Sequence, residues 1–132
     1  MNFGETGSEL PRAVVAEDEG MLRTVLAETL RCEGFIVSEA SDGAQALALI
    51  RTQPWTDLLV SDIRMPVMSG YLVVESGLRL RPGLKVMLMT GYAPEEPPPS
   101  LRPYRFQLLQ KPFDLERFSA MARELLGLPA GR

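Results

Sequence analysis

Four short apolar runs in this sequence each end in polar residues that can do chemistry. In chain order, these residues are Glu17, Asp18, Asp62, Thr90 and Lys111. Carboxylates are the ligands that a hard metal ion prefers, and a carboxylate can also attack phosphorus. A hydroxyl and an ammonium group can stabilise a transferring phosphoryl group. If the runs are parallel strands of one open sheet, their carboxyl ends meet at one crevice, which predicts a site that binds a hard cation and handles a phosphoryl group.

The elements that position these residues follow from the apolar pattern. Short β runs alternate with stretches of helical spacing, and strands are predicted at residues 13–16, 35–37, 58–62, 85–90 and 106–110. Gly34 is predicted to end the first helix, while Asp42, Ser69 and Asp114 begin the second, third and last helices. Five strands alternating with helices indicate a doubly wound α/β fold with a parallel sheet and right-handed crossovers.

One stretch interrupts this alternation. A helix is expected between the fourth and fifth strands, but residues 94–103 of that stretch contain five prolines: Pro94, Pro97, Pro98, Pro99 and Pro103. A proline inside a helix costs about 3 kcal/mol, and the residue before it avoids the helical region. We therefore expect one short turn at most, with the remainder extended or polyproline-like.

The composition fits one globular domain and excludes several functions. The chain has 132 residues and a net charge of −3, which gives no basic face for nucleic acid or anionic lipid. It has no histidine, so any phosphohistidine must belong to a partner, and its one cysteine, Cys32, indicates a reducing, cytoplasmic compartment. No apolar stretch approaches the roughly 20 residues of a membrane span, and residues 1–11 lack the features of a signal peptide.

Together these motifs closely resemble the receiver domain of bacterial response regulators. The motifs are Glu17-Asp18, the D-x-x-M-P pattern of residues 62–66, Thr90-Gly91 and Lys111-Pro112. The resemblance covers residues 12–126, which leaves residues 1–11 as a leader or linker and residues 127–132 as a tail. It implies a flavodoxin-like five-stranded sheet of strand order 2-1-3-4-5, with the fourth helix shortened or replaced by the proline-rich loop.

The resemblance implies a role for each residue of the acidic pocket. Asp62 is expected to be the phosphoacceptor, with a structural cap as its alternative role. Asp18, Asp62 and the backbone carbonyl of Arg64 are expected to bind Mg²⁺, which keeps several of its waters. Glu17, where many receivers have aspartate, is expected to join this metal site mostly through water. Before phosphorylation, Lys111 is expected to pair with Asp62.

The same resemblance implies which groups contact the phosphoryl group. The Thr90 hydroxyl and the Lys111 ammonium are expected to contact it directly. The backbone amides of Arg64 and Gly91 are expected to complete the phosphate cradle. The peptide bond between Lys111 and Pro112 is expected to be cis, and this expectation rests on the family alone because cis is rare for X-Pro bonds in general.

Two features bear on how such a receiver signals. Many receivers have a tyrosine or phenylalanine three residues before the lysine, and this chain has Leu108 there. With the proline-rich segment beside it, this predicts a monomer or weak dimer rather than a dimer through the usual signalling face. The motifs of residues 90–93 and 109–113 are similar to those of receivers fused to hybrid histidine kinases, which implies either such a receiver or a single-domain phosphorelay member.

The leading hypothesis is a phosphoacceptor module that takes a phosphoryl group from a partner histidine kinase or histidine phosphotransfer protein onto Asp62. It is expected to act on no external substrate, and to contact neither nucleic acid nor a membrane. One alternative is an interaction module that signals without phosphorylation. Another is a small metal-dependent phosphatase, although Arg64 occupies the place where such enzymes usually have a second, acid/base aspartate.

Overall fold

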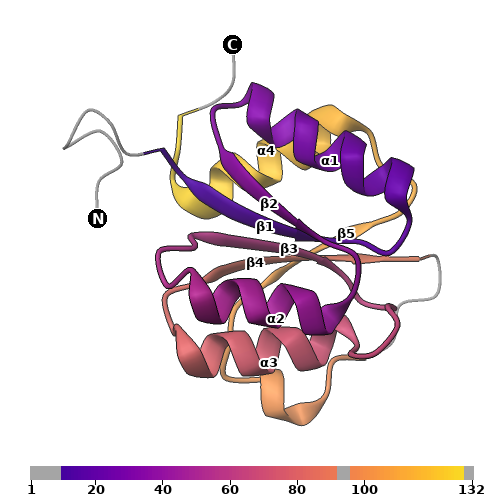
Figure 1. The fold of residues 1–132 in the computed structure, drawn as a ribbon, viewed down its shortest axis with the longest axis vertical. Helices are drawn as coiled ribbons and strands as arrows, with labels where there is room; N and C mark the ends of the chain where they lie inside the picture. The colour runs from indigo at the N-terminus through magenta and orange to yellow at the C-terminus, as the bar shows by residue number, and fades with distance from the viewer. Residues whose placement is uncertain (1–9, 92–95, 130–132) are drawn as a thin grey trace.

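A parallel sheet of five strands forms the centre of this computed structural model, which describes residues 10–91 and 96–129. The strands are β1 (Arg12–Ala16), β2 (Ile36–Ala40), β3 (Leu58–Asp62), β4 (Lys85–Thr90) and β5 (Gln107–Gln110). Their order across the sheet is β2-β1-β3-β4-β5, and every neighbouring pair is parallel (Figure 1). The predicted doubly wound, flavodoxin-like topology is therefore confirmed.

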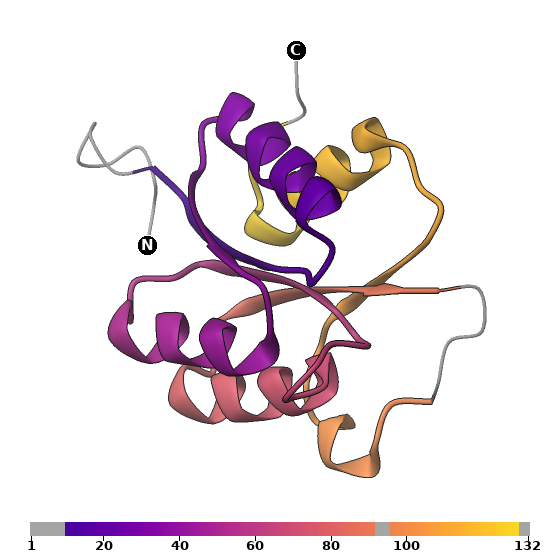
Figure 2. The same ribbon diagram turned by 45° about the vertical axis from the view of Figure 1, so that its right-hand side comes forward.

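Helices cover both faces of this sheet. Helices α1 (Gly20–Cys32) and α4 (Leu115–Leu126) lie on one face, while α2 (Gly43–Thr52) and α3 (Gly70–Leu80) lie side by side on the other (Figures 1 and 2). Within residues 10–91 and 96–129, no helix is long and apolar enough to cross a bilayer.

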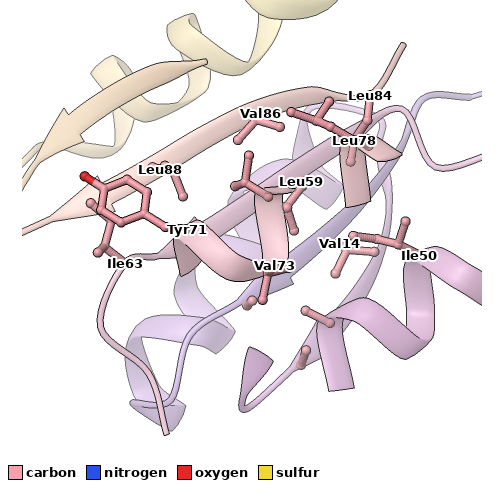
Figure 3. Packing of buried hydrophobic residues seen from close by; sticks show 14 of the residues in the cluster. Val14, Ile50, Leu59, Ile63, Tyr71, Val73, Leu78, Leu84, Val86 and Leu88 are labelled. Atoms are coloured by element: carbon pink, nitrogen blue, oxygen red, sulfur yellow. The ribbon is translucent and has the colours of Figure 1, made fainter. Parts of the chain in front are cut away.

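The central strand β3 supplies both hydrophobic cores, because successive side chains of a strand point to opposite faces. All five of its residues are buried. Leu59 packs with Val14 and Leu88 into the core beneath α2 and α3 (Figure 3), whereas Leu58 and Val60 pack into the core beneath α1 and α4. A continuous apolar run is thus the sequence pattern that this position in the sheet requires.

The predicted helix boundaries are confirmed by their capping contacts. The side chains of Asp42, Ser69 and Asp114 each accept a hydrogen bond from the backbone amide three residues later, at 2.8, 3.3 and 2.7 Å respectively. Helix α1 ends at Cys32, and Gly34 follows it with a φ of 96°, a left-handed conformation that favours glycine. These local contacts place the helix starts and therefore the loops that carry the site.

Strand β2 is longer than predicted. It was predicted at residues 35–37, because Ser38 and Glu39 interrupt the apolar run, but it spans Ile36–Ala40. Ser38 and Glu39 pair in register with Val14 and Val15 of β1. Since β2 lies at the edge of the sheet, it can carry polar side chains that a central strand could not.

The proline-rich segment forms no α-helix in residues 96–106. Its one helical element there is the 3₁₀ turn η1 (Pro99–Leu101), so the prediction of a single short turn is confirmed for these residues, while residues 92–95 lie outside the described part. Leu101 is buried in the core beneath α2 and α3, and Tyr104 and Phe106 pack against the same core. Three apolar side chains thus cover part of the surface that a helix would cover.

The loop between β3 and α3 is tightly constrained at Gly70. Its amide donates to the Ile63 carbonyl at 2.7 Å. A Cβ at Gly70 would lie 2.3 Å from the Asp62 carbonyl oxygen and 2.9 Å from the Ile63 Cα, and neither backbone atom can move independently. In the same loop, Val67 has a φ of 74°, which is a strained conformation for a β-branched residue. Its side chain is 76% exposed, so burial of that side chain does not compensate for the strain.

We predict that Gly70→Ala lowers the free energy of unfolding by about 2–3 kcal/mol, because the added methyl group overpacks a backbone contact. Urea denaturation followed by circular dichroism measures this change. The control is Gly83→Ala, since a Cβ at Gly83 would meet no atom within 4 Å. Equal stability of the two variants would mean that the Gly70 contact is looser than the structure shows.

Candidate functional site

Three carboxylates converge where β1 and β3 end. Ala16 and Ser61 are paired in register, so the residues that follow them, Glu17 and Asp62, emerge side by side. Carboxylate oxygens of Glu17, Asp18 and Asp62 all lie within 4.8 Å of one another. Glu17 is 1% exposed and Asp62 is 9% exposed, whereas Asp18 lies at the surface. The structure therefore brings the three predicted acidic residues into one pocket with an open side.

One ammonium group stands between two of these carboxylates. Lys111 follows β5, and its Nζ lies 3.1 Å from Glu17 Oε1 and 3.3 Å from Asp62 Oδ2. The Lys111 amide also donates to the Thr90 carbonyl at 2.7 Å, which ties this residue to the end of β4. The contact with Asp62 is the one that the sequence predicts, whereas the contact with Glu17 was not predicted.

Burial acts against the negative charge of this pocket. It is the main reason why the pKa of Asp62 is raised, with the nearby Asp18 adding to the effect and Lys111 opposing it. Burial also raises the pKa of Glu17, against the amide of Glu19, and the charge of Asp62 adds to this rise. Burial opposes the charge of Lys111 too, but Glu17 and Asp62 outweigh it and raise the pKa of the ammonium.

The charge balance of the pocket suits a divalent cation. Three carboxylates face one ammonium, so two negative charges remain uncompensated when all four groups are ionised. Oxygen ligands of this kind match Mg²⁺. Both oxygens of Glu17 already accept hydrogen bonds, Oε1 from Lys111 and Oε2 from the Glu19 amide at 3.0 Å, and Asp62 also accepts a hydrogen bond from Lys111. The exposed Asp18 is therefore the most available of the three carboxylates.

The remaining predicted residues surround this pocket. Thr90 ends β4 one residue beyond Met89, which pairs with Asp62, and its buried hydroxyl donates to the Gly91 carbonyl at 3.3 Å. Gly91 is exposed, and no atom of the described residues lies within 4 Å of where its Cβ would be. Arg64 is exposed in the loop that follows β3.

The peptide bond between Lys111 and Pro112 is cis, as expected. Next along the chain, Phe113 stacks on Phe118 of α4, with ring centroids 6.0 Å apart. Phe113 and Phe118 flank the Asp114 cap at the two positions of a hydrophobic staple, and their contact anchors the loop after Lys111 to α4.

Leu108 is much more exposed than Leu109, its neighbour on β5. It is 43% exposed, whereas Leu109 is buried in the core beneath α1 and α4. Because neighbouring side chains of a strand point to opposite faces, Leu108 faces the side of the sheet that carries η1. No aromatic side chain occupies the position three residues before Lys111.

Comparisons with known proteins agree with this architecture. The family model of the response regulator receiver domain matches residues 13–123. The response regulator receiver protein CpdR of Brucella abortus (strain 2308) is 34% identical over 107 residues, which are 80% of this chain and 88% of that protein. The sensor kinase CckA of the same organism is 30% identical over 115 residues, which are 86% of this chain but 12% of the kinase.

A solved structure gives the same result. The crystal structure of the receiver domain from the hybrid histidine kinase CckA superposes with a TM-score of 0.74 at 29% identity, covering 87% of this chain and 98% of that domain. The chain belongs to the response regulator receiver family, whose members are the receiver modules of two-component signalling systems.

The raised pKa of Asp62 predicts how stability varies with pH. A carboxyl whose pKa is higher in the folded state contributes stability at low pH that is lost as the pH rises through that pKa. In chelator, Asp62→Asn should therefore melt roughly 3 °C above the parent chain at pH 7, and by less at pH 4.5. Differential scanning calorimetry measures both differences.

The control for this experiment is Glu116→Gln, which removes one negative charge from an exposed position on α4. A parent chain that melts at or above Asp62→Asn at pH 7 would contradict the expected cost of burying this carboxylate.

Proposed function

We propose that this chain is a phosphoacceptor module of a two-component phosphorelay, in which Asp62 takes a phosphoryl group from the phosphohistidine of a partner protein. The observation that supports this most directly is the convergence of Glu17, Asp18 and Asp62 within 4.8 Å, with the Lys111 ammonium 3.3 Å from Asp62. Family membership supports the class of the reaction.

The transfer exchanges one bond to phosphorus for another. A carboxylate oxygen of Asp62 attacks phosphorus and forms a P–O bond, while the P–N bond to the partner's imidazole breaks. The imidazole nitrogen keeps the electron pair of the broken bond and takes up a proton. Asp62 is then an acyl phosphate, and water later hydrolyses it slowly to return the carboxylate, so no external substrate is turned over.

Each neighbouring group has a defined part in this step. Asp18, Asp62 and the Arg64 carbonyl would hold Mg²⁺, with Glu17 contributing through water because both of its oxygens accept other hydrogen bonds. When bound, Mg²⁺ supplies positive charge against the phosphoryl oxygens. Lys111 stands beside Asp62 to neutralise the remaining charge.

The other contacts come from the loops after β3 and β4. In this proposal, the Thr90 hydroxyl turns from the Gly91 carbonyl to a phosphoryl oxygen. The backbone amides of Arg64 and Gly91 donate to the other phosphoryl oxygens, and the open space at Gly91 leaves room for them.

The partner must supply the histidine, because the chain has none. We propose a histidine kinase or histidine phosphotransfer protein as this partner, acting in the cytoplasm on a monomer or weak dimer of this chain. No direct contact with nucleic acid or a membrane is part of the proposal. The similarity to the sensor kinase CckA and to CpdR is compatible with a receiver fused to a kinase or with a separate one.

A second candidate is a receiver that signals without phosphorylation. It is favoured by the exposed Leu108 in place of an aromatic residue and by the short turn η1 in place of a helix, since both alter the surface that would respond to Thr90. The two candidates differ in whether Asp62 gains a phosphoryl group and whether that gain changes the structure.

We predict that incubation with Mg²⁺ and acetyl phosphate adds one phosphoryl group, because the pocket can accept it from a small donor. Intact mass spectrometry measures the gain, which Asp62→Asn and an excess of chelator should both abolish. The matched control is Asp114→Asn, which alters an aspartate that caps α4 and should leave the gain unchanged. An Asp62→Asn variant that gains mass as the parent does would contradict the assignment, and no gain in the parent would favour the second candidate.

We also predict that Lys111→Ala separates metal binding from transfer. Removing the ammonium leaves Glu17 and Asp62 without their cation, so Mg²⁺ affinity measured by calorimetry should stay equal or rise. The rate of phosphorylation by acetyl phosphate should fall by about 10²-fold, because one charge that stabilises the transfer is lost. Lys85→Ala, at an exposed position on β4, is the control. An unchanged rate would remove Lys111 from the proposed chemistry.

A further inference from the structure

Besides the contact with Lys111, three hydrogen bonds hold the segment that carries Glu17 and Asp18. The Glu17 amide donates to the Ala40 carbonyl at 3.0 Å, and the Glu19 amide donates to Glu17 Oε2 at 3.0 Å. The third contact comes from Arg23, whose Nη1 donates to the Glu17 backbone carbonyl at 2.9 Å. The first two contacts hold the amide and the side chain of Glu17, so Arg23 holds the peptide unit that joins Glu17 to Asp18.

Arg23 is itself fixed from another element. It lies in the first turns of α1, and its Nε is 3.4 Å from Glu39 Oε1 on β2. Glu39 pairs in register with Val15, so this carboxylate belongs to the strand beside β1. A guanidinium group is a rigid planar fork, and a contact on one edge therefore fixes the direction of its other donors.

Asp18 lacks direct support of this kind. In residues 10–91 and 96–129, no hydrogen bond or ion pair holds its carboxylate, which lies at the surface. The carboxylate nevertheless lies within 4.8 Å of those of Glu17 and Asp62. Its direction is therefore set by its backbone, beginning at the peptide unit whose carbonyl Arg23 binds.

We propose that Arg23 is a positioning residue of the acidic pocket: by binding the Glu17 carbonyl from a guanidinium held by Glu39, it directs Asp18 toward a divalent cation. The inference rests on the proposed function, since it takes the pocket to be a Mg²⁺ site. Groups that orient metal ligands without touching the metal commonly affect affinity by 10-fold to 100-fold.

Whether Mg²⁺ binding weakens or tightens when Arg23 is removed distinguishes a positioning role from an effect of its charge. Arg23 carries a positive charge beside the pocket, and like charges repel, so its removal would tighten Mg²⁺ binding if charge were its only influence. Loss of positioning has the opposite sign and weakens binding. An ordinary surface ion pair with Glu39 contributes little to stability and would leave metal affinity unchanged.

The experiment compares Arg23→Ala with Arg31→Ala in the full chain. Arg31 also lies on α1 and also contacts Glu39, at 3.2 Å, but it pairs with Glu28 rather than with the Glu17 carbonyl. Isothermal titration with MgCl₂ gives the affinity of each chain, and circular dichroism verifies that each is folded. In chelator, ¹⁵N relaxation of the Asp18 amide reports the order of its backbone without any metal.

The expected result is a Mg²⁺ affinity about tenfold weaker for Arg23→Ala and within about twofold of the parent for Arg31→Ala. The order parameter of the Asp18 amide should fall in Arg23→Ala alone. Arg23→Gln, whose shorter side chain cannot make both contacts, replaces Arg23→Ala if that variant does not fold.

Two results would overturn the inference in distinguishable ways. Equal or tighter Mg²⁺ binding by Arg23→Ala, beside a parent that binds, overturns the role of Arg23 and leaves the proposed function standing. A parent chain that binds no Mg²⁺ overturns the metal site itself, and the role of Arg23 toward it falls as well.

Discussion

A buried carboxylate pair that shares one ammonium group is the interaction on which this structure depends. Lys111 contacts both Glu17 and Asp62 at distances near 3 Å, yet burial still raises the pKa of each carboxyl. Removing Lys111 would be costly, because both buried carboxylates would be left without compensation. Neutralising Asp62 would not be, because Lys111 stays paired with Glu17. The order of the strands in the sheet makes this contact possible. It places the ends of β1 and β3 next to each other and brings the end of β5 within reach across β4.

Much of the fold could be predicted because its signals are local. The runs at Leu58–Asp62 and Lys85–Thr90 have the bounds that the sequence predicted, since buried central strands require continuous apolar residues. Caps such as Asp42 depend on contacts three residues away, and five prolines suffice to exclude a long helix between β4 and β5. The acidic residues of the pocket were predicted for a related reason, because parallel strands bring their carboxyl ends to one edge.

Two contacts of the pocket could not be predicted from the sequence pattern. Lys111 binds Glu17, which lies 94 residues earlier in the chain. Arg23 is only six residues from Glu17, but no local pattern indicates that its side chain binds the Glu17 backbone carbonyl just after β1. The length of β2 was underestimated because its polar residues interrupt the apolar pattern, and an edge strand tolerates such residues. Val67 also differs from what its residue type predicts. A β-branched side chain favours extended backbone, but Val67 has a φ of 74°.

The long sequence separations within the pocket have a consequence for when it can exist. Lys111 lies 94 residues after Glu17 and 49 residues after Asp62, and the three lie at the ends of different strands of one sheet. A chain that is still emerging from the ribosome has the acidic residues well before it has the lysine that stands between them. Under the proposed function, rapid phosphorylation of Asp62 would therefore require that the sheet has assembled as far as the end of β5, so the acidic residues alone would form only a slow phosphoacceptor.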